Sequence, residues 1–108
     1  MPQVEIRYSS DLSDIHLAEL FNKIEQEINL IDDSAGLCKS RAYMSDQFRH
    51  SHIFVEILVM NKPHRDQAFM EKLQQKLSQL IIPFVPKNCH YSIKLDFLGQ
   101  YYLTGLKL

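Results

Sequence analysis

The chain has 108 residues, of which 45% are hydrophobic and 23% charged, and its formal net charge is −1. This length predicts one domain over residues 1–108 with a modest core. The near-neutral charge argues against general nucleic-acid binding, and no apolar run approaches the roughly 20 residues of a membrane span. Because Cys38 and Cys89 lack metal-ligand spacing and no signal-peptide pattern is present, we expect a cytoplasmic protein.

The first half of the chain predicts a strand, a helix and a second strand. Residues 3–8 alternate apolar and polar side chains, which is typical of a half-buried strand. From about residue 11 to residue 30, apolar side chains recur at helical spacing. Residues 32–36 contain Asp, Ser and Gly and predict a turn. A second strand is predicted over residues 37–43.

The second half repeats this order. Residues 45–51 are polar and predict a loop. Residues 53–60 are rich in Ile, Val and Phe and form the strongest predicted strand, whose nearly continuous apolar run favours a central position. A second helix is predicted over about residues 65–80, where apolar side chains form one stripe.

The last two predicted segments complete the fold. Residues 90–98 alternate and predict another strand, and residues 101–108 predict a short C-terminal strand or hairpin arm. Two strand–helix–strand units in this order predict an α+β fold, a βαββαβ two-layer sandwich. Its four-stranded mixed sheet would carry both helices on one face. The other face would be bare, and an apolar bare face favours an oligomer.

The dipeptide Met1-Pro2 directly precedes the first predicted strand. Initiator methionine is normally removed before a small residue, which would leave Pro2 with a free N-terminal amine. Such an amine has an ordinary pKa of about 7.7–8.0, and burial or nearby cations lower this pKa, so it can act as a base at neutral pH. The alternative is purely structural, because proline is well tolerated at the first residue of a strand.

Four basic residues lie near the ends of predicted elements. Lys39 and Arg41 share one face of the second strand, Arg49 lies in a loop, and Arg65 opens the second helix. Such cations could lower the pKa of a Pro2 amine, bind substrate carboxylates and stabilise a developing enolate. The alternative for each is an exposed surface charge.

Other chemical motifs are weak. His50 and His52 have the spacing of two ligands on one strand face, but no further ligand follows in a recognisable pattern, so we expect no metal site. No Gly-rich phosphate loop or nucleophile motif occurs. Tyr43, Phe48 and Tyr101 could form the apolar wall of a pocket, although core packing is the favoured role for each.

These features together resemble the tautomerase superfamily, and within it the 5-carboxymethyl-2-hydroxymuconate Δ-isomerase family. The resemblance covers nearly the whole chain. It rests on Met1-Pro2, Ala35-Gly36-Leu37, Ser40-Arg41, the strand over residues 52–60, and Arg65. It implies a tautomerase-like fold, also found in macrophage migration inhibitory factor, and a homotrimer whose sheets pack around a central axis.

The resemblance also implies an activity, an isomerase of aromatic catabolism that needs no cofactor. Pro2, freed by removal of Met1, would take a proton from one end of a conjugated hydroxy-dienoate and return it at another carbon. Lys39, Arg41 and Arg65 would hold a small dicarboxylate-type substrate. The family has Arg-Ser-Arg where this chain has Lys39-Ser40-Arg41, which loses one planar guanidinium. A different acidic substrate, or a catalytically silent trimeric ligand-binding or interaction protein on the same fold, is therefore the alternative.

Overall fold

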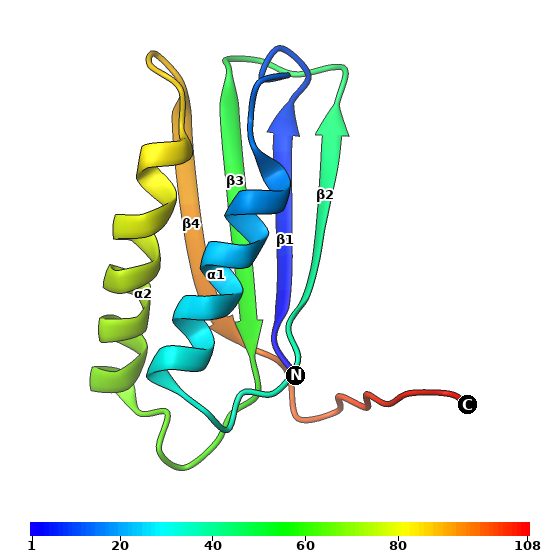
Figure 1. Cartoon of the computed structure of the whole chain (residues 1–108), viewed down its shortest axis with the longest axis vertical. Helices are drawn as coiled ribbons and strands as arrows, with labels where there is room; N and C mark the ends of the chain where they lie inside the picture. The colour runs from blue at the N-terminus through cyan, green and yellow to red at the C-terminus, as the bar shows by residue number, and fades with distance from the viewer.

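The computed structural model describes all residues, 1–108. Its elements are β1 (Gln3–Ser9), α1 (Leu17–Ile31), β2 (Lys39–Ser45), β3 (His52–Val59), α2 (Gln67–Ile81), a short 3₁₀ helix η1 (Ile82–Phe84) and β4 (His90–Phe97). The strands form one sheet in the order β2-β1-β3-β4, in which only β1 and β3 are antiparallel neighbours. Both helices cover the same face of this sheet (Figure 1). The predicted βαββαβ α+β fold is confirmed. None of the helices is both long and apolar enough to cross a membrane.

The core lies between the sheet and the two helices. Alternate residues of β3 point toward the helices, and each of them is at most 1% exposed: Ile53, Val55, Ile57 and Val59. The helices contribute one apolar stripe each: Leu20, Ile24 and Ile28 from α1, and Leu73, Leu77 and Ile81 from α2. The predicted central position of the 53–60 strand is therefore confirmed.

The sheet face that points away from the helices is mostly polar, although Phe54 and Leu58 of β3 also lie on it. Charged side chains form one row across all four strands, because Glu5 is aligned with both Arg41 and Glu56, and Glu56 is aligned with Lys94. Glu5 pairs with Arg41 at 3.5 Å, and Lys94 pairs with Glu56 at 3.2 Å. Arg7 bridges Glu5 and Glu56. The expectation of an apolar bare face is therefore wrong, since its charges pair with one another.

Two segment predictions were also wrong. The helix predicted from about residue 11 begins only at Leu17, because the preceding residues form turns in which Asp11 accepts a hydrogen bond from Ser51. Residues 101–108 form no strand, since their backbone makes no hydrogen bond to a neighbouring strand. This C-terminal tail passes the end of the sheet where β1 begins and then extends beyond it (Figure 1).

Candidate active site

The candidate site lies at the end of the sheet where β1 and β2 begin and β3 and β4 end (Figure 1). Pro2 is buried there, just before β1. Its carbonyl oxygen accepts a hydrogen bond of 3.0 Å from the backbone nitrogen of Lys39. This contact continues the β1–β2 ladder, so the sheet itself holds Pro2 in place.

The terminal amine, which Met1 carries in this structure, has a cationic environment. Burial is the main cause that lowers the pKa of this amine from its ordinary value of 8.0, and the charges of Lys62, Lys39 and Arg65 lower it further. The nitrogen lies 3.6 Å from the Sδ atom of Met60, which is only a weak acceptor. The surroundings therefore favour the neutral amine, the form that can accept a proton.

Lys62 is a member of this cationic group that the sequence analysis missed, since it lies between the strand predicted over residues 53–60 and the helix predicted from about residue 65. Its Nζ atom donates to the carbonyl oxygen of Ser34 at 2.8 Å and to the Ser34 Oγ atom at 3.3 Å. The only sequence signal was its position just after the central strand. Because β3 runs antiparallel to β1, a residue just after β3 lies beside the start of β1, where Pro2 is.

Arg65 is buried rather than free. Its Nε atom donates to the Oδ2 atom of Asp32 at 2.8 Å, and its Nη2 atom forms an ion pair with the same oxygen at 2.8 Å. Its Nη1 atom donates to the carbonyl oxygen of Met60 at 2.7 Å. Its side chain is only 3% exposed. It precedes α2 and does not open it, because Asp66 caps that helix by accepting from the Phe69 nitrogen. Its charge acts on the terminal amine, while its three nitrogens are held by internal partners.

Asp32 connects the end of α1 with the loop that carries Lys62 and Arg65. One carboxylate oxygen accepts from the backbone nitrogen and Oγ atom of Ser34, and the other contacts the Nε2 atom of His64 at 2.8 Å. Burial raises the pKa of Asp32, but the hydrogen bonds from Ser34, His64 and Arg65 outweigh it and hold this pKa well below the ordinary value. Asp32 is therefore ionised at neutral pH.

Lys39 and Arg41 both point to the helix-free face of β2. Lys39 donates to the Oγ1 atom of Thr104 in the C-terminal tail at 2.7 Å. Arg41 donates to the side-chain oxygen of Gln3 and pairs with Glu5. Lys39 lowers the pKa of the terminal amine, whereas Arg41 is not among the charges that do so. Of the two residues, only Lys39 therefore acts on the pKa of the terminal amine.

Three residues that the sequence analysis considered lie elsewhere. Phe48 and Arg49 lie in the β2–β3 loop at the opposite end of the sheet, where the Phe48 ring meets the His52 ring edge-on with centroids 6.4 Å apart. Tyr43 is four residues along β2 from Lys39, which is about 13 Å at the usual strand rise. None of them contributes to the end of the sheet where Pro2 lies.

A cavity of about 290 Å³ adjoins the terminal residue, and we call it the amine cavity. It is lined by Met60, Asn61, Leu98, Gly99, Gln100 and Tyr102. It borders Met1 because the Met60 sulfur contacts the terminal nitrogen and the Tyr102 hydroxyl lies 3.5 Å from the Met1 carbonyl oxygen. No three His, Cys, Asp or Glu side chains are placed to hold a metal ion.

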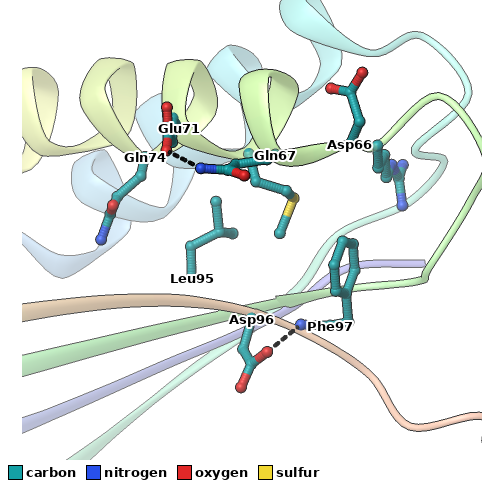
Figure 2. A pocket seen from close by; sticks show the side chains of 9 residues that line it. Asp66, Gln67, Glu71, Gln74, Leu95, Asp96 and Phe97 are labelled. Carbon is teal, nitrogen blue, oxygen red and sulfur yellow. Dashed lines mark hydrogen bonds between the residues drawn. The ribbon is translucent and has the colours of Figure 1, made fainter.

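A second groove, of about 370 Å³, runs between α2 and β4 (Figure 2). Its lining carries the carboxylates of Asp66, Glu71 and Asp96, and its single cation, Arg65, is already paired with Asp32. Such a lining repels anions. The amine cavity has no carboxylate in its lining and borders the terminal amine, whose pKa Lys62, Lys39 and Arg65 lower, so it is the better candidate for an acidic ligand.

Comparisons with known proteins identify the fold. A 5-carboxymethyl-2-hydroxymuconate isomerase from Deinococcus radiodurans R1 superposes with a TM-score of 0.76 at 14% identity, over 99% of this chain and 90% of the other. A 5-carboxymethyl-2-hydroxymuconate delta-isomerase gives 0.71 at 13% identity, over 99% and 89%. A macrophage migration inhibitory factor-like protein from Entamoeba histolytica gives 0.53 at 15% identity, over 96% and 95%. No family model and no curated protein matches the sequence. The resemblance to the tautomerase superfamily is thus confirmed for the fold.

Proposed function

We propose that this chain is an isomerase of the tautomerase type, which moves a proton within a small unsaturated hydroxy or keto acid. Its base is the amine of Pro2 after removal of Met1. The observation that carries the proposal is the burial of Pro2 next to Met1, whose amine has its pKa lowered by burial and by nearby cations. The fold shared with two proteins named as isomerases supports it.

The proposed reaction needs one base and no cofactor. The Pro2 nitrogen takes the proton of the enol hydroxyl, and the O–H electrons form the carbonyl π bond. The double bonds shift toward the far end of the diene, whose carbon then takes the proton back from the Pro2 ammonium. The product is the isomeric keto acid, and the amine is again free for the next cycle.

The substrate is proposed to be an acid, a small dicarboxylate. An ammonium group has three donors. Lys39 donates to Thr104 and Lys62 to Ser34 alone, so each keeps capacity for a carboxylate. Arg65 is proposed to act through its charge, since Asp32 holds its guanidinium.

The proposal predicts a specific pH dependence. A base works in its unprotonated form, so kcat/KM is expected to rise with pH. The cations that lower the pKa of the Met1 amine from its ordinary 8.0 are expected to act in the same direction on the amine of Pro2, which places half-maximal kcat/KM below pH 8.0. Lys62→Met removes a positive charge that disfavours the protonated amine, so the midpoint is expected to move to higher pH. The measurement is kcat/KM across mildly acidic to alkaline pH. Lys76→Met, an exposed change on α2, is the matched control, and equal midpoints in the two variants would remove Lys62 from the site.

We further propose that the protein is a homotrimer. The C-terminal tail carries four large apolar side chains that are at least 84% exposed: Tyr101, Leu103, Leu106 and Leu108. A neighbouring subunit that covers them would remove this apolar surface from water.

Since the family resemblance implies three subunits, light scattering is expected to give three times the mass of one chain. Leu106→Asp is expected to lower this mass, whereas Leu30→Asp, an equally exposed change on α1, is not. A wild-type protein that stays monomeric at high concentration contradicts the proposal.

A further inference from the structure

Tyr102 is a polar residue of the amine cavity for which the proposed function has no role so far. Its hydroxyl accepts a 2.9 Å hydrogen bond from the Nε2 atom of Gln3 and lies 3.5 Å from the carbonyl oxygen of Met1, to which it donates. The Gln3 hydrogen bond is the main cause that lowers the pKa of Tyr102, and Thr104 and the charge of Lys39 lower it further. These contacts make the phenol a stronger proton donor in its hydrogen bonds.

The position of the Met1 carbonyl relates Tyr102 to the proposed base. A carbonyl oxygen lies about 2.3 Å from the nitrogen of its own peptide bond, and here that nitrogen belongs to Pro2. The Tyr102 hydroxyl therefore lies within about 6 Å of the Pro2 nitrogen. Removal of Met1 takes away this carbonyl. A substrate oxygen in its place would be within reach of both the amine and the phenol.

The tail around Tyr102 is held from two sides. Lys39, on β2, donates to Thr104, and Gln3, on β1, donates to Tyr102 itself. The phenol also lines the amine cavity of about 290 Å³, together with the side chains of Asn61 and Gln100. The first residues of β1 and β2 thus fix the phenol at the cavity wall, although the tail has no regular structure.

We propose that Tyr102 is a second catalytic residue, which donates a hydrogen bond to the substrate oxygen that becomes negative. This inference rests on the proposed function of Pro2. When the amine takes the proton, the electron pair of the broken O–H bond leaves a dienolate whose charge lies partly on that oxygen. Tyr102 keeps its own proton and stabilises this charge. The charge disappears when the far carbon takes the proton from the Pro2 ammonium, so the phenol favours the intermediate over the substrate.

The test is the substitution Tyr102→Phe, measured by the isomerisation of a hydroxymuconate or a simple enol acid. Loss of one donor to a developing oxyanion is expected to lower kcat by about 100-fold with little change in KM. Tyr91→Phe is the matched control, because this tyrosine is 48% exposed, is aligned with Ile53 at the opposite end of the sheet and makes no hydrogen bond through its side chain. Circular dichroism establishes that each variant is folded.

The outcomes separate this inference from the function on which it rests. If Pro2→Ala is impaired and Tyr102→Phe retains wild-type kcat, the role of Tyr102 is overturned and the base remains. If the wild type is no faster than Pro2→Ala, the proposed function itself is overturned. A loss in kcat for Tyr102→Phe, without a loss for Tyr91→Phe, supports the inference.

Discussion

Replacing Pro2 with alanine is expected to lower kcat/KM for an enol acid by about 10²–10⁴-fold, the usual contribution of a positioned general base. Pro2 is buried, and its ring would hold the amine at the start of β1. Alanine keeps a terminal amine but loses the ring, so its nitrogen is free to rotate away from the substrate. The decrease in the ultraviolet absorbance of the conjugated substrate gives the rate.

The matched control is Pro86→Ala, an exposed proline beyond α2 that is expected to keep the wild-type rate. Circular dichroism and thermal unfolding of both variants separate a catalytic loss from a loss of fold. Equal rates for Pro2→Ala and Pro86→Ala would take Pro2 out of the mechanism.

Replacing Asp32 with alanine is expected to lower the free energy of unfolding by about 3–5 kcal/mol, as is usual when one partner of a buried ion pair is removed. Asp32 is 7% exposed and Arg65 5% exposed, and the guanidinium would be left buried without its counter-charge. Urea unfolding at neutral pH measures the loss. Asp33→Ala, at the exposed neighbouring carboxylate, is the matched control.

The effect of Asp32 should also depend on pH in a defined direction. Its pKa in the folded protein lies below the ordinary 3.8, so its stabilisation is present above pH 3.8 and is lost as the pH falls below that value. The difference in stability between wild type and Asp32→Ala is therefore expected to shrink in acid. Equal urea midpoints for Asp32→Ala and Asp33→Ala at neutral pH would contradict a structural role for the ion pair.

Much of the fold could be predicted from local patterns. The inward side of β3 is wholly apolar and the helices carry single stripes, so periodicity alone indicates which residues form the core. The start of α1 could not be predicted, because Asp11 is held by Ser51, a residue far along the chain. Alternation in β1 and β4 indicated outward polar positions, but the ion pairs on the sheet face could not be predicted, since pairing of Glu56 with Lys94 depends on strand register.

Some residues of the candidate site could likewise be predicted from the sequence, and others could not. Pro2 and Lys39 could be found from the sequence because both lie at the start of a strand, and parallel pairing brings such starts together. Lys62 and Tyr102 could not, because they reach the amine only through the return of β3 and β4 to the same end of the sheet. Nor could the sequence indicate that Asp32 pairs with Arg65, which was predicted to bind a carboxylate of the substrate.

The alternative function is a catalytically silent interaction protein. It would differ from the proposed enzyme by one covalent bond, the peptide bond between Met1 and Pro2. With Met1 present, its carbonyl oxygen accepts a hydrogen bond from Tyr102 and its backbone blocks the Pro2 nitrogen as an amide. An amide nitrogen has no basic lone pair. On the proposed mechanism, the same fold would therefore be inactive with Met1 present and active once Met1 is removed.

The intact mass of a preparation that isomerises an enol acid tests the central claim most directly. We expect a mass lower than that of the full sequence by one methionine residue, because the proposed base is the free amine of Pro2. An active preparation in which every chain retains Met1 would contradict the account.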